Sequence, residues 1–216
     1  METTLEVRWF VRGIPPSVVQ RWFRVECLGK YIERTETRKD WYVYPEKNLV
    51  DKLNRLLVCK LQPKEINLKL RQDNLELKLE QSKLGSHNFG RVKNLYTCQG
   101  KVQQWLKFGE SELHNFGIYR SMLNKTKAIA VDKKRDQKIY RNVKSELTCL
   151  QVNQEPWWTI AFEMNQKYDK QQEYNCFKQV IETFCQTYYG PKLSADNSYG
   201  YSRWLLKFAP IPILSY

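Results

Sequence analysis

The chain has 216 residues, of which 42% are hydrophobic and 13% aromatic. This composition excludes a disordered chain, because it supplies enough apolar surface for a sizeable core, and the length suits one large domain. No apolar run is as long as a membrane-spanning helix, and residues 1–8 lack the features of a signal peptide. We therefore expect a single soluble domain over residues 1–216, cytoplasmic and not bound to a membrane.

Charge is the strongest compositional signal. Lys and Arg total 36 against 23 Asp and Glu, which gives a formal net charge of +13. A field of this sign concentrates anions near the protein. The candidate anions are nucleic acid, a phosphorylated metabolite or polymer, and a membrane surface. The alternative is a basic surface that is only solvated by water.

The sequence lacks the common signatures of catalytic and metal sites. Its six cysteines are scattered without a C-x-x-C pair, and the only histidines are His87 and His114. A Cys/His metal site is therefore not expected, and reduced thiols are the simplest state of the cysteines. No G-x-S-x-G elbow, P-loop or Rossmann glycine pattern occurs, so those classes are set aside.

The first sixty residues contain one clear strand and one clear helix. In residues 4–11 every second side chain is apolar, which predicts a strand with one apolar and one charged face. Apolar residues at helical spacing predict an amphipathic helix over residues 16–28. Strand formers fill residues 37–44, whereas residues 49–61 suit either a short helix or a strand.

A hairpin follows, and it separates apolar from charged side chains. Residues 66–71 and 75–80 both have period two and are joined by a short polar turn. One face carries the leucines, Leu68, Leu70, Leu75, Leu77 and Leu79. The other carries the charged residues, Lys69, Arg71, Glu76, Lys78 and Glu80.

The rest of the chain is also rich in strand patterns. Residues 82–90 suggest a loop, and residues 91–98 and 101–108 suggest a second hairpin that turns at Gln99-Gly100. A less regular segment spans residues 109–126. Further strands are predicted over residues 127–135, 138–143, 146–152 and 157–164. A second helix is expected over residues 170–188.

About eight strands with two main flanking helices predict an α+β fold that is mainly antiparallel β, with a closed or strongly curved sheet. Alternating strands normally turn the apolar face to the core and the charged face to water. The other arrangement is a hollow barrel, packed on its outside by helices and lined inside by the charged faces. Basic residues recur on several strand faces, which favours the hollow barrel.

Short motifs are spread along these predicted strands. They are Thr4-Leu-Glu6-Val-Arg8, Asp40-Trp-Tyr42 followed by Pro45, Lys69-Leu-Arg71, Leu75-Glu-Leu-Lys78, Lys133-Lys-Arg135, Ala161-Phe-Glu163 and Ser198-Tyr199. Their order resembles that of the CYTH family, the triphosphate tunnel metalloenzymes, over most of the chain. The resemblance implies an eight-stranded antiparallel tunnel in which inward-facing Lys and Arg hold ligand phosphates. It also implies a divalent cation, Mg or Mn, held by inward-facing glutamates.

The resemblance assigns roles to particular residues. It implies phosphate binding by Arg8, Lys69, Arg71, Lys78, Lys133 and Arg135, and metal binding by Glu6 and Glu163. Thr4 and Ala161 stand where the family has carboxylates, and an Asp of the family is replaced near Gln151 or Asn153. Because a hard divalent cation is retained mainly by carboxylates, metal binding is expected to be weakened. The Lys and Arg residues of the family's motifs are preserved, so the resemblance supports phosphate binding better than hydrolysis.

The residues themselves leave alternatives open. Lys69, Arg71 and Lys78 occupy alternate positions on adjacent strands, so their charged ends can reach one phosphate chain. They could equally pair with Glu76 and Glu80 in an exposed salt-bridge ladder. In the same way, Glu6 could serve only to neutralise Arg8, two residues along the same strand face.

The leading hypothesis is that the chain binds a triphosphate or polyphosphate compound, with metal-dependent hydrolysis as a further possibility. The alternative is a catalytically inactive module of the same fold that binds RNA or another polyanion. Tryptophans such as Trp157 and Trp158 could stack bases, but a Trp on a strand more often packs in a core. No nucleic-acid-binding signature is visible, and the oligomeric state is not indicated.

Overall fold

The computed structural model describes residues 2–57, 65–72, 74–92, 96–122, 128–167 and 169–209. Its centre is a closed barrel with the strand order β1-β5-β4-β3-β2-β6-β7-β8, and every neighbouring pair is antiparallel. The strands are β1 (Glu2–Arg12), β2 (Lys30–Val43), β3 (Ile66–Arg71), β4 (Asn74–Val92), β5 (Tyr96–Phe108), β6 (Ala128–Tyr140), β7 (Val143–Val152) and β8 (Glu155–Gln166). The predicted fold class, an eight-stranded antiparallel tunnel barrel with flanking helices, is confirmed.

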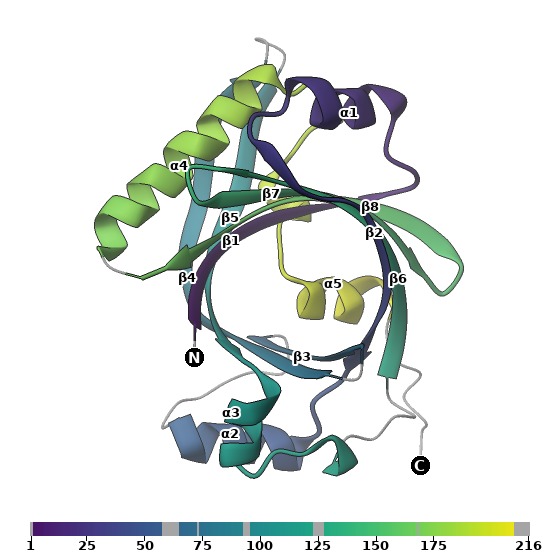
Figure 1. The fold of residues 1–216 in the computed structure, drawn as a ribbon, viewed down its shortest axis with the longest axis vertical. Helices are drawn as coiled ribbons and strands as arrows, with labels where there is room; N and C mark the ends of the chain where they lie inside the picture. Colours follow the sequence, from purple (N-terminus) through teal and green to yellow (C-terminus); the bar gives the residue numbers. More distant parts are fainter. Residues whose placement is uncertain are drawn as a thin grey trace.

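Helices surround the barrel and enter one end of it. They are α1 (Ser17–Arg21), which continues as a π-helix (Trp22–Glu26), α2 (Lys47–Leu57), α3 (Glu110–Asn115), α4 (Lys170–Thr187) and α5 (Tyr201–Phe208). Short 3-10 turns lie at Arg120–Met122 and Ala195–Asn197. Figure 1 shows α1 and α4 on one side of the barrel, α2 and α3 on the opposite side below β3, and α5 within the ring of strands. None of the described helices is long and apolar enough to cross a membrane.

The strands turn their apolar faces outward. Leu5, Val7 and Trp9 of β1 belong to one buried cluster with Phe177 and Ile181 of α4. On the other side of the barrel, the leucines of the β3–β4 hairpin pack with residues of α2 and α3. Because these helices cover the outside, the charged alternate positions point inward. The hollow arrangement is therefore the one adopted.

The inward-facing positions become apolar at one end of the barrel. There Phe10, Val131 and Trp157 pack with Trp204 and Leu205 of α5 in a third buried cluster. The rings of Phe10 and Trp204 stack with centroids 4.7 Å apart. Helix α5 thus fills this end of the barrel, a feature that the sequence did not predict.

Two predicted connections were wrong because irregular strands resemble loops in sequence. Residues 82–90 belong to β4, whose register with β5 shifts three times between Glu80 and Arg91. Gly85 and Gly90 take positive φ values of 89° and 93°, which only glycine adopts without strain. The predicted turn at Gln99-Gly100 lies inside the continuous strand β5.

Other predicted helix and strand boundaries also differ from those in the structure. The helix predicted over residues 16–28 ends earlier and as a π-helix. Most of the two strands predicted over residues 127–135 and 138–143 forms one strand, β6, which ends at Tyr140; residues 141–142 form a turn, Val143 begins β7, and Lys127 lies outside the described residues. Residues 49–57 are helical, while residues 58–61 also fall outside the described ranges. The irregular segment 109–126 contains α3 and a 3-10 turn, and residues 123–126 are not described.

The structure describes five of the six cysteines, and Cys185 Sγ lies 2.8 Å from Cys98 Sγ. The five described cysteines, Cys27, Cys98, Cys149, Cys176 and Cys185, are all free. The sixth, Cys59, lies outside the described residues.

Gly100 is required by close packing between β5 and β1. A Cβ at this position would lie 2.5 Å from Trp9 Cζ2 and 2.7 Å from Val7 Cγ2. We expect Gly100→Ala to lower the free energy of unfolding by about 1–3 kcal/mol through overpacking, measured by urea denaturation. The neighbouring exposed change Gln99→Ala is the control and should stay within about 0.5 kcal/mol of wild type. Equal stability of the two variants would contradict this packing.

Candidate functional site

A cavity of about 180 Å³ occupies the interior of the barrel. All eight strands and α5 contribute side chains to its wall. Nine of these are cationic, namely Arg8, Arg38, Lys69, Arg71, Lys78, Lys107, Lys133, Arg135 and Lys144. Four are glutamates, namely Glu6, Glu76, Glu146 and Glu163.

The structure brings together all eight residues that the sequence singled out for phosphate or metal binding. Each of them lines this one cavity. Their proposed roles stay predictions, because a shared location does not identify a ligand. The side chains that sequence reasoning missed as site residues are Arg38, Asp40, Glu146, Tyr201, Lys107 and Lys144. Arg38 and Asp40 could have been found, because they alternate with Tyr42 on one face of a predicted strand.

Four cationic side chains surround the carboxylate of Asp40. Their contacts to it are 2.8 Å for Lys133 Nζ, 3.2 Å for Arg38 Nε, 3.7 Å for Lys69 Nζ and 3.7 Å for Arg71 Nε. The Asp40 side chain is completely buried, so water does not screen these charges. Burial alone would raise the pKa of Asp40, but Lys133, Lys69 and Arg38 outweigh it and hold the pKa well below its usual range.

The carboxylates around this cluster do not fully neutralise its buried cations. Glu76 adds contacts of 3.0 Å to Lys69 and 3.1 Å to Arg71. Even so, burial and the charge of Arg71 together lower the pKa of Lys69 to about 8, against the opposing effect of Asp40. Burial also lowers the pKa of Lys133 well below its usual value, with Lys69 adding to the effect. An added anion would relieve this imbalance.

The ladder expected between the hairpin charges exists, but it lies inside the barrel. Glu76 is the residue that pairs with Lys69 and Arg71. Glu80 instead accepts a hydrogen bond of 2.6 Å from Gln103 and lies 3.6 Å from Arg203. The hairpin therefore presents its basic residues to the cavity and not to bulk water.

A second network links the opening strand to its neighbours. Arg8 donates to Glu6 Oε1 at 2.9 Å and to Glu146 Oε1 at 2.7 Å, so the predicted Glu6–Arg8 pair is present. Lys78 Nζ lies 3.2 Å from Glu6 Oε2 and 3.2 Å from Glu163 Oε2. Although burial opposes it, the charges of Lys78 and Arg8 lower the pKa of Glu6 to about 2.

The residues at the predicted metal position do not fit a Mg or Mn ion. Glu6 and Glu163 converge on the ammonium group of Lys78. The neighbouring inward positions are Thr4 and Ala161, which carry no carboxylate. Over the part of the chain that the structure describes, no three His, Cys, Asp or Glu side chains are grouped to hold a metal. A hard cation takes six or more oxygen ligands, so two carboxylates already paired with lysine are a poor donor set.

The cavity is closed at its inner end and open at its outer end. Tyr201 of α5 forms part of the inner end, where Lys133 Nζ lies 3.9 Å and Arg8 Cζ 4.8 Å from its ring centroid. These distances are typical of cation–π contacts. Lys144 is exposed and Lys107 is half-buried, which marks the opening. The wall therefore stays cationic from the opening to the aromatic floor.

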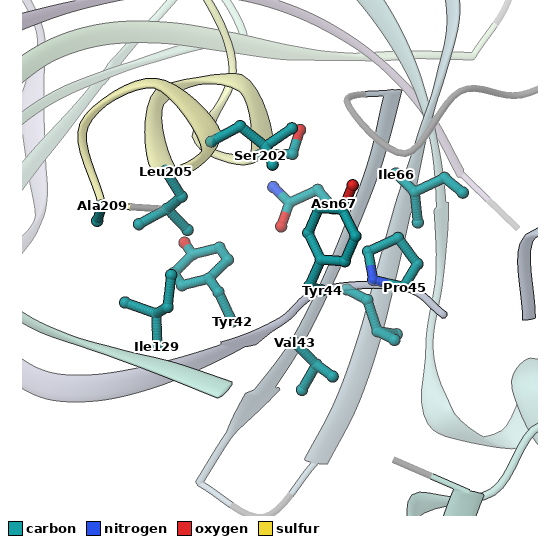
Figure 2. Close-up of a pocket in the computed structure, with 12 residues that line it drawn as sticks. Tyr42, Val43, Tyr44, Pro45, Ile66, Asn67, Ile129, Ser202, Leu205 and Ala209 are labelled. Atoms are coloured by element: carbon teal, nitrogen blue, oxygen red, sulfur yellow. The ribbon is translucent and has the colours of Figure 1, made fainter. Parts of the chain in front are cut away.

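A smaller cavity of about 30 Å³ lies between α5 and strands β2 and β3. Figure 2 shows Leu205 of α5, and Ala209 just after the helix, facing Tyr42 and Ile129 across it. Its lining is mainly apolar and contains no charged side chain. It is therefore part of the packing of α5 and a poor candidate for an anion site.

Comparisons with known proteins give only distant structural matches. No protein-family model and no curated protein matches the chain. A solved structure from Bacillus halodurans, provisionally named an adenylate cyclase, is 11% identical with a TM-score of 0.45, and the match covers 96% of this chain and 99% of that one. A conserved hypothetical protein from Pyrococcus furiosus (11% identical) and a protein from Pyrococcus horikoshii (13%) each give a TM-score of 0.40, covering 84% of this chain and 90% of theirs. Matches at this level carry no argument about activity or ligand.

Asp40 should stabilise the fold strongly at neutral pH. We expect Asp40→Asn to lower the free energy of unfolding by about 3–5 kcal/mol, because it leaves several buried cations without their shared counter-charge. The depressed native pKa of Asp40 means that its contribution is complete above the unfolded pKa of about 4 and is lost as the pH falls toward the native pKa. Urea denaturation should therefore show that the difference in the free energy of unfolding between wild type and variant becomes smaller below about pH 4.

The control for this experiment is Asp132→Asn on β6. The Asp132 side chain is 56% exposed and pairs with the exposed Lys39, so its loss should cost less than about 0.5 kcal/mol. Similar effects of the two substitutions at neutral pH would show that Asp40 is not the shared counter-charge.

Proposed function

We propose that the barrel binds a triphosphate or polyphosphate compound through the cationic wall of its cavity. The supporting observation is the excess of positive charge in an enclosed space. Nine Lys and Arg side chains line the cavity with four Glu. Asp40, Glu36 and Glu2 pair with members of this set, so nine positive groups still face seven negative ones. Buried charge without compensation is costly, and a bound polyanion would supply the missing compensation.

The chemistry of the wall suits phosphate oxygens. Arginines present a planar fork that can bind two oxygens of one phosphate, and lysines present mobile ammonium groups. Arg71 and Lys69 come from β3, whereas Lys133 and Arg135 come from β6 on the other side of β2. A cavity of about 180 Å³ holds on the order of ten water-sized groups, which suits a chain of two or three phosphates.

The closed inner end favours a ligand that enters by its terminal phosphate. Its phosphate chain would contact Lys69 and Lys133, and the rest of the molecule would extend past Lys107 and Lys144. A continuous RNA strand could not leave through the end of the barrel that α5 fills. Of the seven tryptophans, only Trp41 is exposed, and the others are buried in packing, so the cavity offers bases no tryptophan platform. The RNA-binding alternative therefore has less support.

Metal-dependent hydrolysis is a separate prediction from binding. The donor set at Glu6 and Glu163 does not support it, and no catalytic residue is assigned. Phosphate released from tripolyphosphate in the presence of Mg²⁺ or Mn²⁺ would add that activity to the proposal.

The proposal is tested by removing two cations from β3. We expect tripolyphosphate to raise the melting temperature of the wild type, because it binds the native state. In Lys69→Ala/Arg71→Ala the affinity measured by calorimetry should fall on the order of 100-fold, as two charge-assisted contacts are lost. The matched control, Lys39→Ala/Lys134→Ala, removes two exposed lysines of the barrel's outer face and should bind nearly as well as wild type. No stabilisation of wild type at low salt, or an equal loss in the control, would refute the proposal.

Binding should also weaken as the pH rises through the pKa of Lys69. That pKa is about 8, and an anion binds the protonated ammonium better. Between about pH 7 and pH 9 the affinity for tripolyphosphate should therefore fall about tenfold through this residue. In Lys69→Arg the charge persists over this range, so calorimetry should show a flatter dependence. An identical pH dependence in both proteins would contradict the role of Lys69.

A further inference from the structure

We propose that Lys78 occupies the place of a divalent cation, so that the cavity binds its phosphorylated ligand without metal. This inference rests on the proposed function and adds that the site needs no metal cofactor to bind its ligand. Glu6, Lys78 and Glu163, which come from three strands, converge at one point of the cavity wall, and the nearby Glu146 is paired with arginines.

The two carboxylates are brought together by strand pairing. Glu6 of β1 and Glu163 of β8 are direct cross-strand partners on the inward face. Lys78 of β4 reaches between them, with its Nζ 3.2 Å from one oxygen of each. Its side chain is only 13% exposed, so the ammonium is held within the wall. A cation thus already lies between the two carboxylates to which the family resemblance assigned metal binding.

A divalent ion could enter only by displacing this ammonium. It would leave Lys78 buried beside a second positive charge, which is costly. The next carboxylate of the network cannot easily help, because Glu146 is bonded to Arg8 at 2.7 Å and to Arg135 at 3.1 Å. The carboxylates of this site are therefore already paired with lysine and arginine side chains.

Lys78 can perform the electrostatic task of a metal in binding. It neutralises the carboxylates that would otherwise repel a phosphate. An ammonium group has three N–H donors, of which two are directed to Glu6 and Glu163. Lys78 also lines the cavity, so the third donor is available to a phosphate oxygen. Mg²⁺ in solution would then compete with the protein for the phosphate chain.

The first test compares calorimetric titrations of tripolyphosphate in EDTA and in excess Mg²⁺. We expect binding in EDTA, and binding at least about fivefold weaker in Mg²⁺. Binding that requires Mg²⁺ or Mn²⁺, or that tightens with either ion, would overturn the inference. Binding in neither condition would refute the proposed function, and the second test would then decide the role of Lys78 independently of any phosphate.

The second test measures Mn²⁺ binding by electron paramagnetic resonance. Wild type should bind no Mn²⁺ at this position. Lys78→Ala, or Lys78→Met if the smaller side chain impairs folding, should gain one Mn²⁺ site, because it frees the carboxylate of Glu163 and the Oε2 oxygen of Glu6, whose Oε1 stays bonded to Arg8. The added change Glu163→Gln should abolish that gain. Mn²⁺ binding by wild type as tight as by the Lys78 variants, lost on Glu163→Gln, would show that lysine does not replace the ion.

Discussion

At the centre of the barrel, the carboxylate of Asp40 lies between ammonium and guanidinium groups from three strands. Lys133 reaches it from β6, Lys69 and Arg71 from β3, and Arg38 from its own strand β2. These cations could not be buried so close together without a shared negative charge. Because Asp40 compensates them only in part, the interior keeps a positive excess, and the proposed anion binding would depend on the same contacts that stabilise the wall.

This interior depends on the packing of the outer surface. The apolar faces of β1, β3 and β4 need partners, which α4 supplies on one side and α2 and α3 supply on the other. With the apolar faces covered outside, the alternating strands have to point their charges inward. Helix α5 then fills one end of the barrel with aromatic side chains, next to the cationic cavity.

Local alternation predicted part of this arrangement and could not predict the rest. The alternation of apolar and charged residues in the two strands of the hairpin was enough to place Lys69, Arg71 and Lys78 on one face. The family resemblance added Arg8 and Lys133 to the candidate site. Alternation alone is the same whether charges face water or a cavity, so only the covering helices decide between the two. The pairing of β2 with β6, which runs from Lys30 opposite Ile139 to Val43 opposite Ala128, joins segments far apart in the chain, and no local pattern indicates it. For the same reason Glu146 was missed, since its contact with Arg8 exists only after the barrel closes.

The most direct test is a crystal structure of the protein grown with tripolyphosphate in the presence of EDTA. The phosphate chain should lie inside the barrel, contacting Lys69 and Lys133 at the inner end, with Lys78 still bonded to Glu6 and Glu163. Phosphates found only on the outer surface, with the interior ion pairs unchanged, would show that the positive excess of the cavity is not a ligand site.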